Sequence, residues 1–361
     1  MKKLYFGLIA IFLGTSAYAQ TSSCTQVLRL VRTTYEQGRL HELPKLVEGC
    51  LKSEDPNKSF TKAEKREAYR YLTLSYIYLE EPEAADSMML KLLETDHFYQ
   101  VNDLVDPAEF VALYNKFRVD PVFRLGLKLG LNITQPTVLN YYNVGNTAGG
   151  QGTYGMKPAF NVYLSYEQDL GRKTLRSTRK KFVMTGEVGL VTRNYNYTNN
   201  NLGTLENPKG VQSVQEGVVS QSWIDVNAIA QYKLKNTINL QTYIGFGPGI
   251  SYLLSSNNQA NTTLANSFTV TGPTVDDSKV YNKLVYSATV VAGLKYKVGE
   301  LYVTGEARYQ VGFSNVVNPS SRTNPELAFD YQMEYNDYRM SNFAINIGVI
   351  YPYFKPKKLI K

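Results

Sequence analysis

Apolar and polar residues alternate most regularly between Leu301 and Phe313. The odd positions are apolar or small, whereas the even positions include Thr304, Glu306 and Arg308. Alternation with a period of two predicts an extended strand with one apolar and one polar face. The segment is long enough to cross a bilayer when tilted, which takes about 9–11 residues. We therefore predict a membrane-spanning strand whose apolar face meets lipid and whose charged residues point into a lumen.

Eight segments of the chain share this alternation. In order, they are Val122–Ile133, Met156–Gln168, Arg179–Tyr197, Ser222–Leu234, Thr237–Leu253, Lys283–Val298, Leu301–Phe313 and Arg339–Phe354. The connections between them alternate in length. Those near 169–178, 235–236 and 299–300 are short or moderate, and those near 134–155, 198–221, 254–282 and 314–338 are long and polar. This rhythm is typical of outer-membrane barrels, whereas a soluble β-sandwich does not require it.

We therefore predict an eight-stranded antiparallel transmembrane β-barrel over residues 120–361. An even number of strands puts both chain ends of the barrel on the side of the short turns, which is the periplasmic side of such barrels. We call this side the short-turn end, and the opposite side the long-loop end.

Before the barrel, residues 20–119 carry apolar residues at helical spacing. The run from Lys62 to Leu79, the turn at Glu81-Pro82-Glu83 and the run from Ala84 to Glu94 resemble a tetratricopeptide (TPR) unit of about 34 residues. The Trp-Leu-Gly part of that pattern is absent, and at most about two units fit. We predict a small α-helical, TPR-like domain. It is either a packed bundle that only fills space or a periplasmic docking module.

The first 19 residues have the features of a secretory signal peptide. Lys2 and Lys3 precede an apolar run, and Ala17-Tyr18-Ala19 forms a cleavage site. The mature chain is therefore expected to enter an oxidising compartment, where Cys24 and Cys50 can form a disulfide. Sequence spacing alone does not establish the short approach that the bond needs, so two free thiols are the alternative.

The charge of the chain does not indicate a nucleic-acid partner. The formal net charge is +8, and Lys2 and Lys3 belong to the expected signal peptide. No run of five like charges occurs. The 29 tyrosines suit the aromatic girdles that flank the apolar band of a membrane barrel.

The sequence offers little for catalysis or metal binding. The only histidines, His41 and His97, lie in the helical segment, so the barrel has no imidazole base beside a nucleophile. No cysteine pair at ligand spacing and no Asp-rich calcium loop occurs, so we expect no cofactor and no metal. We expect Asp276 and Asp277 to be a solvated pair in a loop.

Charged residues at inward positions form the strongest candidate site. Counted from the short turns, five of them fall at similar middle depth: Lys128, Glu187, Asp225, Glu306 and Arg308. Isolated buried charges cost several kcal/mol each, and the interior of an eight-stranded barrel is just wide enough for side chains to fill. The set is either a salt-bridge plug or the gate of a narrow pore.

Nearer the short-turn end, four cations are expected to form a basic mouth with Glu167 as the nearby acid: Arg124, Lys233, Lys295 and Lys297. This mouth attracts acidic partners or lipid headgroups, or is simply solvated.

A signal peptide, a helical segment and a Tyr-rich barrel with strands such as RLGLKLGLNI (124–133) together resemble the outer-membrane β-barrels of Bacteroidota, the PorT-like group. The resemblance implies placement in the outer membrane and, in some members, a role in secretion machinery. It assigns no role to any residue. We expect a non-enzymatic barrel, surrounded by outer-membrane lipid, that anchors a docking domain for a protein partner bound through residues 21–118. A narrow gated channel and a membrane-embedded hydrolase are the alternatives.

Overall fold

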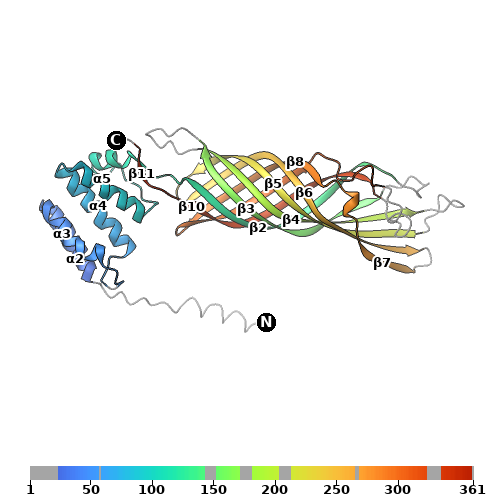
Figure 1. The fold of residues 1–361 in the computed structure, drawn as a ribbon, viewed down its shortest axis with the longest axis horizontal. Helices are drawn as coiled ribbons and strands as arrows, with labels where there is room; N and C mark the ends of the chain where they lie inside the picture. Colours follow the sequence, from blue (N-terminus) through green and yellow to red (C-terminus); the bar gives the residue numbers. More distant parts are fainter. Residues whose placement is uncertain are drawn as a thin grey trace. The chain divides into compact units, whose positions relative to one another are not determined.

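The computed structural model describes residues 23–56, 58–142, 152–170, 181–202, 213–264, 268–322 and 335–359. The chain divides into a helical unit, Met1–Asp120 with Lys355–Lys361, and a sheet unit, Pro121–Phe354 (Figure 1). The expected signal peptide, residues 1–19, lies outside the described residues. The division falls one residue from the expected boundary, but the last residues belong to the helical unit and not to the barrel.

The helical unit contains α2 (Ser23–Glu36), η1 (Leu40–Glu42), α3 (Leu43–Lys52), α4 (Lys62–Tyr78), α5 (Pro82–Thr95) and α6 (Ala108–Tyr114). The start of α4 is fixed by a capping box, in which Thr61 and Glu64 each accept a hydrogen bond from the other's backbone N–H. Gly38, with φ of 75°, turns the chain after α2. None of the helices described is both long enough and apolar enough to span a membrane.

Two apolar clusters hold the helices together. One joins α2, α3 and the first half of α4 around Val31, Leu43 and Leu72. The other joins α4, α5 and α6 around Met89 and Phe110. A disulfide between Cys24 on α2 and Cys50 on α3 crosses the first cluster. The helical unit therefore has a core of its own.

The C-terminal residues return to the helical unit. β11 (Lys357–Lys358) pairs antiparallel with β1 (Phe117–Arg118), and Lys358 forms an ion pair with Asp86 on α5. The Arg118 guanidinium also donates to the backbone carbonyl of Lys355 at 3.1 Å. Both chain ends of the sheet unit thus continue into the helical unit.

Eight strands of the sheet unit close into an antiparallel ring, in the order β2-β3-β4-β5-β6-β8-β9-β10 and back to β2 (Figure 1). Their bounds are β2 (Phe123–Asn140), β3 (Thr153–Leu170), β4 (Phe182–Leu202), β5 (Ser213–Asn236), β6 (Leu240–Leu264), β8 (Leu284–Val298), β9 (Leu301–Gly312) and β10 (Asp337–Tyr353). The prediction of an eight-stranded antiparallel barrel is confirmed.

Several strands run further toward the long-loop end than predicted. β5 begins at Ser213, β6 ends at Leu264, and a further strand, β7 (Thr269–Asp276), pairs with β6 inside the expected loop at 254–282. These extensions are rich in Asn, Ser and Thr, so their composition resembles a loop. Nevertheless, their backbone groups bond across the ladder, and Asn258 and Ala260 of β6 remain buried.

The alternation seen in the sequence corresponds to the two faces of the barrel wall. On β2, the outward side chains Leu125 to Leu131 are 42–56 % exposed, whereas Lys128 between them is fully buried. The inward positions beside Lys128 are Gly126 and Gly130. A Cβ at Gly130 would overlap the side chains of Asn161 and Asn346, so the glycines leave space for polar side chains inside the barrel.

Candidate functional site: ion pairs in the barrel lumen

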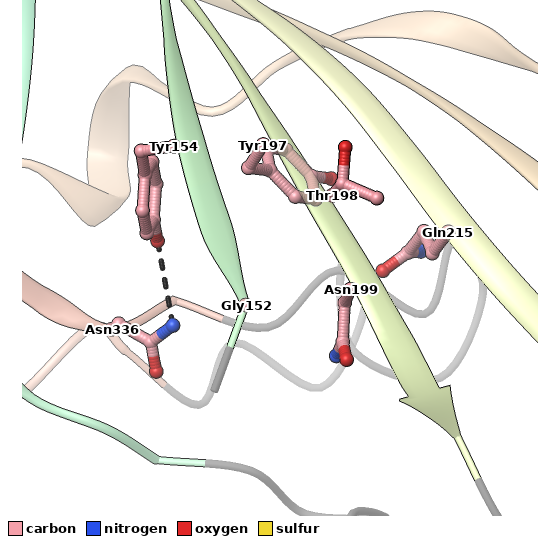
Figure 2. A pocket seen from close by; sticks show the side chains of 7 residues that line it. All are labelled: Gly152, Tyr154, Tyr197, Thr198, Asn199, Gln215 and Asn336. Atoms are coloured by element: carbon pink, nitrogen blue, oxygen red, sulfur yellow. Dashed lines mark hydrogen bonds between the residues drawn. The ribbon is translucent and has the colours of Figure 1, made fainter. Parts of the chain in front are cut away.

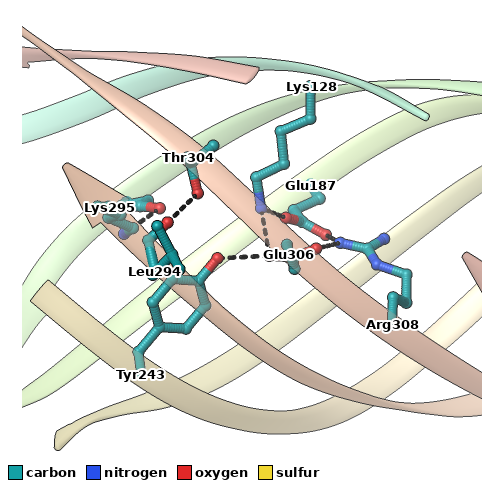
Figure 3. A network of polar contacts seen from close by, with 9 residues as sticks. Lys128, Glu187, Tyr243, Leu294, Lys295, Thr304, Glu306 and Arg308 are labelled. Carbon is teal, nitrogen blue, oxygen red and sulfur yellow. Dashed lines mark hydrogen bonds and ion pairs between the residues drawn. The ribbon is translucent and has the colours of Figure 1, made fainter. Parts of the chain in front are cut away.

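Four charged side chains meet in the middle of the lumen, and we call them the central cluster: Lys128 of β2, Glu187 of β4, and Glu306 and Arg308 of β9. The Lys128 ammonium lies 2.8 Å from Glu187 Oε1 and 2.7 Å from Glu306 Oε2. The Arg308 guanidinium lies 2.9 Å from Glu306 Oε1 and also pairs with Glu187 (Figure 3). Each of these side chains is at most 1 % exposed. The two cations and two anions therefore neutralise each other without solvent.

Two tyrosines complete the central cluster. The Tyr243 hydroxyl donates to Glu306 Oε2 at 2.7 Å, and the Arg308 guanidinium stacks on the Tyr163 ring at 4.2 Å from its centroid. Gly189 lies on β4, opposite β3. It leaves space for the Tyr163 ring, because a Cβ at position 189 would overlap that ring. Neither tyrosine is among the residues predicted for the site from the sequence. They could have been found from the alternation, because both occupy inward positions, where most neighbouring residues are polar or small.

Asp225 forms its ion pair with Arg193 and not within the central cluster, which corrects the prediction, but the Tyr163 hydroxyl of that cluster donates to Asp225 Oδ2 at 3.4 Å. In the register of β4 with β5, Glu187 pairs with Asn227, so Asp225 lies two residues nearer the long-loop end. There Arg193 Nη2 donates to both of its carboxylate oxygens at 2.9 Å, and to Gln310 Oε1 at 3.1 Å. We call Arg193, Asp225 and Gln310 the Arg193 cluster. Arg193 is not among the residues predicted for the site, although it lies on β4 at the same parity as Glu187.

At the short-turn end, three of the four cations of the expected basic mouth are buried in ion pairs, and Glu167 is one of their acids as predicted. Arg124 and Lys233 both bind Asp169, each at 2.7 Å, and the Lys295 ammonium lies 2.7 Å from Glu167 Oε1. These five side chains are at most 6 % exposed, and we call them the short-turn cluster. Asp169 was expected in a turn, but β3 extends to Leu170 and points this carboxylate inward.

Lys297 is the fourth residue of the expected mouth. It is partly exposed near the end of β8, and its backbone N–H donates to the carbonyl of Asn239 at 2.9 Å. The three clusters together place six cations against five carboxylates inside the barrel. The charge of these three clusters is thus nearly balanced, and their ion pairs lie at three successive depths.

At the long-loop end, Asp277 is buried, although we expected it to be solvated. Its backbone N–H donates to the Ser256 carbonyl at 3.2 Å, which holds it against β6. Its carboxylate accepts hydrogen bonds from the hydroxyls of Tyr281 at 3.2 Å and Tyr335 at 3.1 Å. Burial raises the pKa of Asp277, which lies outside the strands, above its usual value despite these bonds. Asp276, its neighbour, is exposed as expected.

The described residues offer no group of three or more His, Cys, Asp or Glu side chains placed to hold a metal ion. The carboxylates of the lumen are instead bound by Lys and Arg. The arrangement can cross-link strands and block passage.

Comparisons with known proteins give the following results. Residues 116–318 match the family model described as outer membrane protein beta-barrel domain. Among solved structures, Neisserial surface protein A (11 % identity, TM-score 0.31) is matched over 64 % of this chain and 97 % of its own. OprG from Pseudomonas aeruginosa (10 %, TM-score 0.33) is matched over 65 % and 98 %. The outer membrane protease OmpT from Escherichia coli (10 %, TM-score 0.32) is matched over 64 % and 96 %. A search of curated proteins found no match.

Proposed function

Because the chain belongs to the outer membrane protein beta-barrel domain family, we propose that it is a non-enzymatic anchor, whose sealed barrel fixes a helical docking unit to the outer membrane. The central cluster carries this proposal. Its charges come from three strands and are excluded from solvent. Passage of a hydrated ion would require separating these pairs, and the cost of leaving one of them unpaired is about 3–5 kcal/mol.

The chain termini of the barrel support the anchoring role. The first strand of the barrel follows β1, the last precedes β11, and these two short strands pair with each other in the helical unit. The helical unit is therefore tied to the barrel by two chain segments and not by one. Such a double connection suits a module that must stay at the membrane while it binds a partner.

The finer parts of the proposal rest on the sequence pattern. The helical hairpin of α4 and α5 resembles a TPR unit, and helical repeats commonly bind other proteins. We propose a protein partner bound through residues 21–118, and short turns and chain termini on the periplasmic side. The PorT-like resemblance supports a role in secretion or envelope assembly in a member of the Bacteroidota.

A narrow gated channel is the second candidate, and one observation favours it. The side-chain amides of Asn132, Asn161 and Asn346 are buried in the lumen and make no hydrogen bond within the described part of the chain. Buried polar groups of this kind are normally satisfied by ordered water. Water beside the central cluster is where a conducting path would begin if the ion pairs rearranged.

Photo-crosslinking in native membranes tests the docking role. A photoreactive residue replaces Leu30 or Tyr78, which are 48 % and 51 % exposed on the helical unit. A matched control replaces Ile347, which is 68 % exposed on the outer face of β10. We expect a protein adduct of discrete mass from at least one helical position and none from Ile347. Adducts absent from both helical positions would contradict the docking role.

A further inference from the structure

Two spaces in the described part of the barrel are too small for a ligand. At the long-loop end, the space beside Tyr154, Tyr197 and Asn336 measures about 20 Å³, which is room for about one water molecule (Figure 2). The Tyr154 hydroxyl there already accepts a hydrogen bond from the Asn336 side chain at 3.4 Å. A second space, beside Arg193 and Ser251, measures about 10 Å³. The helical unit, in contrast, has an exposed feature that suits a larger partner.

This feature consists of Leu104 and Val105, in the connection between α5 and α6. Leu104 is 94 % exposed and Val105 is 72 % exposed. Leu104 is the most exposed of the large apolar residues described, ahead even of Phe160 on the outer face of β3, at 72 %. Scattered apolar residues are normal on a protein surface, whereas adjacent ones rimmed by polar groups mark sites of contact.

The segment that carries them, residues 102–106, is closed by its own hydrogen bonds, and we call it the Leu104 loop. The Asn102 side chain accepts from the Leu104 backbone N–H at 3.1 Å. The Asn102 carbonyl accepts from the backbone N–H groups of Val105 at 2.9 Å and Asp106 at 2.8 Å. In return, the Asp106 carboxylate accepts from the Asn102 backbone N–H at 2.8 Å. These bonds fix a turn that leaves both apolar side chains in solvent.

An ion pair fastens the Leu104 loop to α4. The Arg70 guanidinium lies 2.6 Å from Asp106 Oδ1, and the Asp106 side chain is only 7 % exposed. The same guanidinium lies 5.9 Å from the ring centroids of both Tyr71 and Phe110. Folding Leu104 back onto its own chain would therefore require breaking these contacts. A loop that is already fixed also loses little entropy when a partner covers it.

The surroundings of the Leu104 loop are acidic. Residues 92–115 include five carboxylates and no Lys or Arg. Of these acids, Asp106 pairs with Arg70, and Asp96 lies 3.4 Å from a nitrogen of Arg66. Asp103, which directly precedes Leu104, and Glu109, in the first turn of α6, are exposed. The apolar pair is thus flanked by exposed negative charge.

This combination fits a protein surface better than a lipid surface. Segments that insert into a bilayer interface usually carry Lys or Arg beside their apolar residues, because lipid phosphates are anionic. An apolar anchor surrounded by a charged rim is instead the arrangement of many protein–protein contacts. A negative rim is matched by a positive one on the partner.

We propose that the Leu104 loop inserts Leu104 and Val105 into an apolar socket on a protein partner, and that Lys or Arg residues border this socket. The proposal rests on the docking role proposed above and names the surface that performs it. Leu104 and Val105 supply the apolar contact, Asp103 and Glu109 the charge complementarity, and the bonds of Asn102 and Asp106 the fixed shape.

Photo-crosslinking of the full-length protein in native membranes tests this proposal. A photoreactive residue replaces Val105, and a matched control replaces Lys45, an exposed residue of α3. Mass spectrometry of the adduct distinguishes a peptide of another protein from a lipid and from a second copy of this chain. We expect position 105 to yield a peptide adduct with one other protein, and position 45 to yield none.

Variants that carry the same probe at position 105 test the two parts of the socket. Leu104→Ser should lower the yield of that adduct about tenfold, because the apolar anchor is lost. Asp103→Lys should lower it as well, whereas the matched charge reversal at an exposed acid after α3, Glu54→Lys, should not. Raising NaCl from about 50 to about 500 mM should lower the yield from the parent, because salt screens the rim charges. Helical circular dichroism shows that each variant is folded.

The possible outcomes separate this proposal from the docking role. A lipid adduct, an adduct with a second copy, or no adduct from position 105 when Leu30 or Tyr78 gives one would overturn the Leu104 loop as the docking surface and leave the docking role standing. A yield that is unchanged in folded Leu104→Ser, in folded Asp103→Lys or at high salt would overturn the socket as proposed. Absence of adducts from all three positions would contradict both proposals.

Discussion

Lys128 and Glu187 form a 2.8 Å ion pair across β3, the strand that separates β2 from β4 in the ring. The pair therefore reaches over a neighbouring strand through the lumen. Arg308 binds the same Glu187 from β9, so this carboxylate links the two sides of the barrel. This relationship makes the central cluster a structural cross-link as well as a block in the lumen.

Removing Lys128 should destabilise the barrel. In Lys128→Met, Arg308 alone faces Glu187 and Glu306, and the cluster carries one uncompensated negative charge. Loss of one partner from a buried pair costs about 3–5 kcal/mol, which should appear as a lower urea midpoint in micelles. Adding Glu187→Gln should recover part of this loss because the excess charge is removed. Lys235→Ala, an exposed lysine at a turn, serves as the control. A Lys128→Met protein as stable as this control would contradict the account.

The disulfide should stabilise the helical unit only. Cys24 and Cys50 are 26 residues apart, and closing a loop of such size typically contributes about 2–4 kcal/mol. The double variant Cys24→Ser, Cys50→Ser should therefore lose helical circular dichroism at lower urea, while the heat-resistant gel mobility of the barrel is unchanged. Thiol titration of the unreduced parent should find no free thiol, and detection of two would refute the bond.

Surface labelling tests the orientation of the barrel, and the structure changes the choice of positions. Asn258 is only 2 % exposed because β6 continues past it, whereas Asn257 and Ser320 are exposed. On intact cells, Asn257→Cys and Ser320→Cys should react with an impermeant maleimide. Asn239→Cys, at a short turn, should react only after lysis. The reverse pattern would place the long-loop end in the periplasm.

Alkaline pH should destabilise the helical unit. Burial raises the pKa of Tyr35 and of Tyr99 from 10.0 to about 12. The unfolded chain therefore releases these protons at lower pH than the folded one, so stability is complete below about pH 10 and falls as pH rises from there to about 12. Urea unfolding followed by helical circular dichroism should show this loss, and Tyr99→Phe should reduce it. A helical midpoint that stays constant over this interval would contradict the burial of these phenols.

The strands were predictable because lipid and lumen impose opposite requirements on successive residues. That constraint ends beyond the bilayer, so polar composition concealed the extension of β6 beyond Leu253. The return of β11 to β1 left no signal, because two residues are too few for a pattern.

The candidate site was predictable to a similar extent. Lys128, Glu187, Glu306 and Arg308 could be grouped by parity and depth alone. Asp225 was placed wrongly because its depth depends on the register of β5 against β4, which the sequence does not state. Asp169 could be recognised only once the end of β3 was known, whereas Arg193 lies inside the predicted strand Arg179–Tyr197 at the parity of Glu187 and could have been grouped with the inward charges from the sequence.

The conductance of the purified protein in planar bilayers tests the sealed lumen most directly. The parent should show no steady current. Arg308→Ala should conduct, because it strands carboxylate charge in the central cluster and removes the guanidinium that stacks on Tyr163. The control Arg339→Ala, which removes an exposed arginine at the start of β10, should remain silent. A parent protein with a large open-channel current, or an Arg308→Ala protein as silent as its control, would contradict the account.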